Sequence, residues 1–227
     1  IGSGLVGSEM CIRDRLMTEL RKKEDPKVYA ELGYRDASVI PLFIEVMEKE
    51  KTAVKYQAEK AVRKISEERP AMLLPYVDRL IGLLDSDNNF IRWGMLLTLP
   101  GLLEAGGKDI WMKMRTRYLL SFRSRQVAEF GNAVSSTGKI MRACPEEEET
   151  IIPLLLKIDS HTFFHHGVPS PECLNVAKGH ILECFLEQFP DTAYRTEMAS
   201  FAKQNLENDR KQVCIRARRL MKLAGEV

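Results

Sequence analysis

The sequence lacks an apolar run of about 18 residues, the length that a helix needs to cross a bilayer. Its N-terminus lacks the charged, apolar and small-residue segments of a secretory signal peptide. Its 5 cysteines form no CxxC pair and are too few for a disulfide framework, which is typical of a reducing compartment. From these absences we expect a cytoplasmic protein with no membrane partner.

Catalytic and metal-binding motifs are missing too. There is no GxSxG, HExxH or calcium-loop pattern. The segment GNAVSSTGKI has six residues between Gly131 and Gly138, where a phosphate loop has four, and Ile140 stands where that loop needs Ser or Thr. We therefore expect a protein that is not an enzyme and has no catalytic residue, no cofactor, no metal site and no small-molecule substrate.

Strong charge and strand-like alternation are also absent. The 34 Lys+Arg and 32 Asp+Glu residues leave a net charge of +2, which predicts no global attraction to nucleic acid. A 44% share of hydrophobic residues is enough for a sizeable core. From Leu16 onwards the apolar residues recur at helical spacing, so the sequence predicts an all-α fold.

The first segment, IGSGLVGSEMCIRDR (1–15), is different in kind. It is rich in Gly and Ser, lacks continuous helical periodicity and resembles a translated sequencing adapter. We predict that residues 1–15 are a non-native or disordered tail, in which case Cys11 is not a native thiol; a native flexible tail is the alternative. Residues 16–227 are predicted to form a single repeat domain.

A repeat runs through that domain. Residues 39–65 and 72–103 both read as an apolar helix with an early proline, a polar turn and a second, amphipathic helix. Each second helix opens on an apolar marker, followed by small or apolar residues on the same helical face. The markers, spaced by 37, 36, 46 and 40 residues, are Val54, Ile91, Val127, Cys173 and Val213. After capping helices at 16–37, this spacing predicts five hairpins at about 38–70, 71–107, 108–144, 145–190 and 191–227.

This pattern resembles the HEAT-repeat family, an armadillo-type class of helical repeats, over about residues 38–227. The matching features are a proline in the first helix, a basic residue after the marker and acidic residues in the turn. They are Pro41, Pro75 and Pro153; Lys55 and Arg92; and Asp85 and Asp87. The later repeats depart from the pattern, with Ala128, Leu174 and Cys214 in the basic position. The resemblance implies a right-handed α-solenoid that binds a partner on its concave surface.

Candidate binding residues lie just after the markers. We expect the second helices to present Lys55, Tyr56, Glu59, Arg92, Trp93, Glu129 and Asn132 to a protein or peptide. Aromatic residues beside arginines are enriched at binding hot spots. Burial of Trp93 against a neighbouring repeat is the alternative. The sequence thus favours a non-enzymatic scaffold for protein–protein interaction.

A basic, aromatic stripe supports a second hypothesis. WMKMRTRYLLSFRSR (111–125) carries Lys113, Arg115, Arg117, Arg123 and Arg125 and, with its surroundings, gives residues 108–143 a local excess of +6. Such a stripe can contact phosphates, and helical DNA glycosylases for alkylated bases are similar at the level of fold. Their catalytic aspartate has no counterpart here. The alternatives are arginines that keep their charges at a solvated rim, and an accessory role beside an enzyme.

Local signals complete the expectations. His161, His165 and His166 fall in a predicted inserted loop (159–172), where anchoring by Phe163 and Phe164 is favoured over metal binding. His180 is expected inside the repeat. Pro100 should kink or end its helix.

Overall fold

The computed structural model describes residues 3–225 and the side chains of residues 12–225. The chain divides into two compact units, with the division between Gly106 and Gly107. The expected all-α fold is confirmed, because the described residues contain only two short strands. None of the helices in this part of the chain is both long and apolar enough to cross a bilayer.

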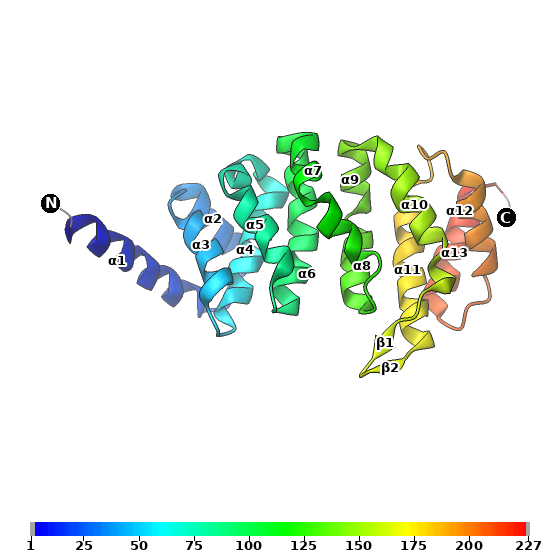
Figure 1. Cartoon of the computed structure of the whole chain (residues 1–227), viewed down its shortest axis with the longest axis horizontal. Coiled ribbons are helices and arrows are strands. Elements are labelled where there is room, and N and C mark those ends of the chain that lie inside the picture. The colour runs from blue at the N-terminus through cyan, green and yellow to red at the C-terminus, as the bar shows by residue number, and fades with distance from the viewer. Residues whose placement is uncertain (1–2, 226–227) are drawn as a thin grey trace. The chain divides into compact units, whose positions relative to one another are not determined.

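The first unit consists of helices packed against their neighbours in sequence (Figure 1). It contains α1 (Ser3–Leu20), α2 (Pro26–Arg35), α3 (Val39–Lys49), α4 (Val54–Glu68), η1 (Pro70–Tyr76), α5 (Val77–Gly82), η2 (Leu83–Asp85), α6 (Asn89–Thr98) and η3 (Leu99–Leu102). Helix α4 packs against α2, α3 and α6. It therefore forms the centre of a row of three helices, α2, α4 and α6.

The marker pattern explains this packing. In α4, Ala58, Ala61 and Val62 are fully buried, whereas the marker Val54 is half-exposed. In α6 the marker Ile91 is buried together with Met95. The apolar stripe of each helix therefore faces the core, as the helical spacing predicts.

Prolines shape the ends of these helices. Pro70 and Pro75 lie in the 3₁₀ helix η1, and Pro100 lies in η3 directly after the end of α6 at Thr98. A proline removes a backbone donor and disfavours continuation of an α-helix. The expectation that Pro100 ends its helix is confirmed.

The second unit begins within α7 (Leu103–Ser121), which is interrupted at Gly107 by non-helical angles (φ 60°, ψ −152°). Its further elements are α8 (Val127–Ser135), α9 (Thr137–Ala143), η4 (Pro145–Glu147), α10 (Glu148–Leu156), η5 (Ile158–Ser160), β1 (Phe164–His165), β2 (Val168–Pro169), α11 (Pro171–Gln188), α12 (Arg195–Gln204) and α13 (Lys211–Leu223). Helix α11 packs against α8 and α13, which gives this unit a row of three helices as well.

The inserted loop forms a β-hairpin, which the sequence analysis did not predict. Phe164 pairs with Pro169, and His165 pairs with Val168. The turn places His166 and Gly167 at φ 50° and 79°, angles typical of the two central residues of a tight hairpin. Phe163 is buried, as expected of an anchor, whereas Phe164 is half-exposed beneath the guanidinium of Arg125.

The N-terminal segment is part of a helix from Ser3 onwards. Helix α1 runs from Ser3 through the segment 1–15, and its last turns bury Leu16 and Leu20. The helix contacts α3 and α4. Residues 1 and 2, and the side chain of Cys11, lie outside the described residues. The hypothesis that 1–15 is foreign to the native protein and the predicted repeat limits remain predictions.

Candidate functional site

Three of the predicted binding residues lie on the seam between α4 and α6: Tyr56, Glu59 and Trp93. Two contacts set the register of the helices. The ring of Tyr56 meets that of Phe90, and the carboxylate of Glu59 lies against the backbone of Gly94. Residues three apart on a helix share one face, so Trp93, between Phe90 and Gly94 in this register, lies on the same seam.

Asn88 joins the two helices at one end of the seam. Its side-chain oxygen accepts a hydrogen bond from the backbone N–H of Ile91 (3.2 Å) and so caps α6. Its Nδ2 donates to the hydroxyl of Tyr56 (3.2 Å). One side chain therefore begins α6 and holds the ring of Tyr56 in place.

Three aromatic rings form an aromatic patch on this seam: Tyr56, Phe90 and Trp93. The ring centroids of Tyr56 and Phe90 are 5.4 Å apart, and those of Phe90 and Trp93 are 5.3 Å apart. Both pairs meet edge to face, at interplanar angles of 63° and 67°. Such pairs contribute about 0.5–1.5 kcal/mol beyond the area they bury. Phe90, in the middle, is nevertheless 62% exposed.

Phe90 was not among the site residues predicted from the sequence. The signal was present, because Phe90 stands one residue before the marker Ile91, off the core face, and three residues before Trp93. Trp93 itself is half-exposed, but its indole Nε1 is buried and meets no acceptor among the described residues. Trp93 is therefore partly buried, between the exposed position predicted for a binding residue and the burial given as the alternative.

Two basic residues stand next to residues of the aromatic patch in the sequence: Lys55 before Tyr56 and Arg92 before Trp93. The ammonium of Lys55 lies 5.6 Å from the centroid of the Tyr56 ring. Arg92 donates from Nη1 to the carbonyl of Ser86 and from Nη2 to Oδ1 of Asn89, both at 2.7 Å. The guanidinium of Arg92 therefore supports the turn before α6.

The position of Glu59 differs from the one expected from the sequence. The sequence analysis placed it among residues presented to a partner, yet it is only 7% exposed. Its carboxylate fills the space beside Gly94, where a Cβ would lie 2.3 Å from Oε1. Arg63 Nε is 3.3 Å away, but no described residue donates a hydrogen bond to Oε1. Burial raises the pKa of Glu59, and the positive charges of Arg63 and Lys60 only partly oppose this.

The basic stripe lies in the second unit, on and after α7. Arg115 donates from Nε to the buried Glu147 (2.6 Å) and from Nη2 to Thr150 (3.3 Å). Lys108 forms an ion pair with Glu146. Arg117 and Arg123 are exposed, and Arg125 lies over the ring of Phe164, 5.4 Å from its centroid. Part of the local positive charge is therefore paired with the glutamates that follow.

The histidines take structural positions. The ring of His161 packs on Phe130 and Phe163, and its Nε2 is 2.9 Å from the carbonyl oxygen of Ser124. His180 is half-exposed, and its ring fills the space left by Gly131. Burial, followed by the charges of Arg216 and Arg210, lowers its pKa. Across the residues that the structure describes, no three His, Cys, Asp or Glu side chains come together as metal ligands would.

Ion pairs link α11 to α13 in the helix row of the second unit. Arg216 lies 2.6 Å from Glu183, and its Nη1 donates to the carbonyl of Gly179 (3.2 Å). Arg210 pairs with Glu172 on the neighbouring helix. Glu129 also has an interaction partner, and Asn132 is half-exposed. This row exposes charge rather than aromatic rings.

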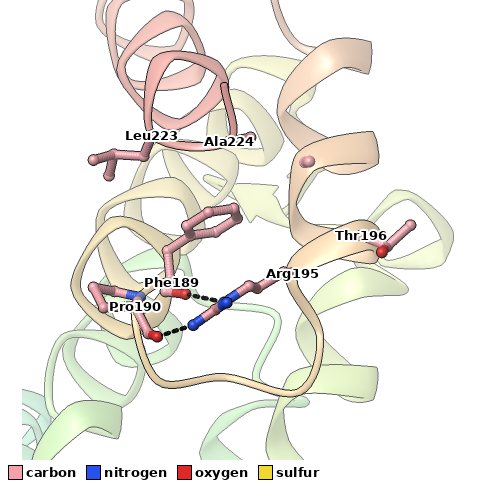
Figure 2. A pocket seen from close by; sticks show the side chains of 7 residues that line it. Phe189, Pro190, Arg195, Thr196, Leu223 and Ala224 are labelled. Atoms are coloured by element: carbon pink, nitrogen blue, oxygen red, sulfur yellow. Dashed lines mark hydrogen bonds between the residues drawn. The ribbon is translucent and has the colours of Figure 1, made fainter. Parts of the chain in front are cut away.

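A pocket lies at the C-terminal end of the second unit (Figure 2). Phe189, Pro190, Leu223 and Ala224 are among its lining residues. Arg195 donates from Nε to the carbonyl of Phe189 (3.1 Å) and from Nη2 to that of Pro190. The guanidinium therefore satisfies carbonyl groups at the end of α11, a structural role that a cation favours there.

No known protein-family profile and no curated protein sequence matches the chain. Two similar solved structures are designed armadillo repeat proteins. One, in complex with the peptide (KR)4, is 11% identical, has a TM-score of 0.58 and covers 97% of this chain and 95% of that one. The other is 14% identical, with a TM-score of 0.51 and coverage of 92% and 98%.

The fold is an armadillo-type helical repeat. The similarity at these identities concerns the fold alone, and it agrees with the predicted α-solenoid class. The predicted right-handed twist and the count of five repeats remain predictions. In such folds each helical hairpin buries its apolar face against its neighbours.

Proposed function

We propose that this protein is a non-enzymatic interaction module and that the aromatic patch on α4 and α6 binds a peptide or an extended segment of a protein partner. The observation that carries the proposal is the exposed ring of Phe90 between Tyr56 and Trp93. An exposed phenyl ring loses contact with water when a partner covers it, and clustered aromatics are typical of binding hot spots.

Further support comes from the way the aromatic patch is held. Asn88 fixes Tyr56 through a hydrogen bond, and the edge-to-face contacts fix the other two rings. A partner therefore loses less side-chain entropy in binding these rings than in binding flexible side chains. The designed armadillo repeat protein with a bound peptide supports a peptide as the class of ligand.

The nucleic-acid alternative has weaker support. Two residues of the basic region, Lys108 and Arg115, already form ion pairs with Glu146 and Glu147. The predicted site residues also fall into two groups: Lys55, Tyr56, Arg92 and Trp93 in the first unit, and Arg115, Arg117, Arg123 and Arg125 in the second. We therefore propose that the partner binds the residues of the first group.

The proposal is tested by selecting peptides from a displayed library against the whole chain and measuring their affinity for two variants. Phe90→Ala should weaken binding about 30-fold, which corresponds to about 2 kcal/mol. Leu120→Ala is the matched control, because Leu120 on α7 is also 62% exposed. It should leave affinity unchanged. Peptides that bind wild type and Phe90→Ala equally would overturn the proposal.

A further inference from the structure

The pocket at the C-terminal end of the second unit combines apolar walls with one positive charge (Figure 2). Its lining comes from three places: the end of α11, the start of α12 and the end of α13. Apolar walls are supplied by Phe189, Pro190, Ala199, Leu223 and Ala224. Among the described residues that line it, Arg195 is the one that carries a charge. The pocket therefore favours a ligand with an apolar group and a negative charge.

Leu223 gives the pocket an apolar wall that water reaches. This side chain is 57% exposed, whereas Phe189 and Ala199 are buried. An apolar group that enters the pocket would remove the surface of Leu223 from contact with water, which is favourable in proportion to the area covered. The exposed leucine thus accounts for the apolar half of the ligand.

Arg195 accounts for the charged half, because it is held in position while part of its guanidinium stays available. Nε and Nη2 donate to the carbonyls of Phe189 and Pro190, so the side chain crosses from α12 to the end of α11 (Figure 2). Nη1 donates to no described residue, and no described carboxylate pairs with Arg195. A fixed guanidinium binds a carboxylate at little cost in side-chain entropy.

The surface beside the pocket is also positive. Helix α13 contains no acidic residue. Two of its exposed cations, Arg219 and Lys222, lie in the turn before Leu223 and pair with no described carboxylate. Asp191, next to Pro190 in the sequence, is exposed but does not line the pocket. An anion is therefore attracted to this end of the second unit.

We infer that this pocket binds the C-terminal residue of a partner chain, with its apolar side chain against Leu223 and its terminal carboxylate on Arg195. The charge and the apolar walls belong to one pocket, so one residue must supply both groups. A C-terminal leucine carries a carboxylate and an apolar side chain on the same carbon atom. In aspartate or glutamate the side chain is itself the acid, and a second residue would have to supply the apolar group.

The experiment measures the affinity of the whole chain for the peptide Ser-Gly-Ser-Leu, labelled with fluorescein at its N-terminus, by fluorescence anisotropy. Two peptides with the same label test the two halves of the ligand. The first ends in a carboxamide and lacks the charge, and the second ends in glycine and lacks the apolar side chain. Each should bind about tenfold more weakly than the leucine acid.

Two variants test the two halves of the pocket. Arg195→Gln should weaken the leucine acid about tenfold. Arg218→Gln, which removes an exposed cation of α13 that does not line the pocket, is its control and should have no effect. Urea midpoints will show whether the loss of the bonds from Arg195 to the two carbonyls destabilises the fold.

Leu223→Asp keeps the test independent of that stability, because the side chain is exposed. It places a negative charge at the wall of the pocket and should weaken the leucine acid about tenfold. Leu120→Asp is the matched control, since Leu120 on α7 is 62% exposed and does not line the pocket. It should leave the affinity unchanged.

The outcomes separate this inference from the proposed function, on which it does not rest. Equal affinity for the acid and the carboxamide, or no effect of Leu223→Asp, would overturn it. If the peptide binds only to a chain shortened after Gly225, the chain's own last residues occupy the pocket, and a partner chain is the wrong ligand. Phe90→Ala should leave the affinity unchanged; a loss would place the peptide on the aromatic patch and contradict the inference while supporting the proposed function.

Discussion

Among the residues whose side chains the structure describes, each unit buries one glutamate, and different contacts hold the two. Glu59 in the first unit is 7% exposed, and Glu147 in the second is 5% exposed. Arg115 donates to Oε1 of Glu147 at 2.6 Å, whereas Oε1 of Glu59 receives no hydrogen bond from a described residue. Oε2 of Glu147 also lacks a described donor, so the difference lies in the single strong bond from Arg115.

The pKa values of the two carboxyl groups are shifted in opposite directions. Burial alone raises the pKa of both carboxyl groups. For Glu59 the rise persists, but for Glu147 the hydrogen bond from Arg115, the nearby indole of Trp111 and the charge of Arg115 together outweigh it, and the pKa is lowered. Glu147 therefore stabilises the fold as an anion. Burial makes the anionic form of Glu59 less favourable.

The largest effect is expected from Glu147→Gln. Loss of the charge-assisted bond from Arg115 should lower the free energy of unfolding by about 2 kcal/mol at neutral pH, measured by urea denaturation. Because the folded-state pKa is lowered, this stabilisation is complete above the ordinary carboxyl pKa and is lost as the pH falls through the lowered value. Wild type and variant should therefore converge in acid.

The control for this change is the neighbouring Glu146, which pairs with Lys108 at the surface. Glu146→Gln should leave the unfolding midpoint unchanged, since an exposed ion pair contributes little. If both substitutions lower the free energy of unfolding equally, the buried Arg115–Glu147 bond stabilises the fold no more than an exposed ion pair does. The proposed difference between Glu147 and Glu59 would then be wrong.

The second-largest effect on the free energy of unfolding is expected from Gly94→Ala, which would crowd Glu59 against α6. In Gly94→Ala the new Cβ would lie 2.3 Å from Oε1 and 2.6 Å from Cγ of Glu59, so the buried side chain must move. We expect a loss of about 1.5 kcal/mol in the free energy of unfolding. The double variant Glu59→Ala with Gly94→Ala should recover most of this loss in a double-mutant cycle.

A matched glycine checks that the loss comes from crowding. Gly82, at the end of α5, has helical angles, and a Cβ at this position would meet no atom within 4 Å. Gly82→Ala should raise the free energy of unfolding by about 0.5 kcal/mol, because alanine reduces the entropy of the unfolded chain. Equal losses at both glycines would point to the backbone and not to Glu59.

The smallest effect is expected from Glu59→Met, which replaces the buried acid with an apolar side chain of similar length. It should raise the free energy of unfolding by about 1 kcal/mol at neutral pH. Because the pKa of Glu59 is raised in the folded chain, the folded state binds more protons between the ordinary and the raised pKa. Wild-type stability therefore falls as the pH rises through this window.

The gain from Glu59→Met should accordingly shrink as the pH falls to the ordinary carboxyl pKa, where the wild-type carboxyl is protonated. The measurement is a series of urea midpoints from neutral to acidic pH for wild type and variant. A variant that is less stable at neutral pH would show that Arg63 compensates Glu59 fully, and the two buried glutamates would then be alike.

The sequence predicted those features that depend on local periodicity. Ala58, Val62 and Met95 are buried where the marker spacing places them, and Tyr56 and Trp93 lie off the core face. Helical spacing decides these positions, because a single helix has one apolar stripe to bury.

Features that depend on contacts between distant residues could not be predicted. Arg115 and Glu147 are 32 residues apart in the sequence, and nothing local pairs them. Glu59 is buried because Gly94 on another helix leaves room for it. The β-hairpin was missed since its strands have two residues each, too few for an alternating pattern.

Gly107 has space around it for a side chain, but its backbone angles disfavour every residue that has one. A Cβ at this position would meet nothing within 4 Å, yet the backbone angles (φ 60°, ψ −152°) belong to a region that glycine alone populates readily. In a survey of all substitutions, position 107 would therefore be restricted as a core position is, although open space surrounds it. The restriction is one of chirality, because only the achiral residue can take these angles without strain.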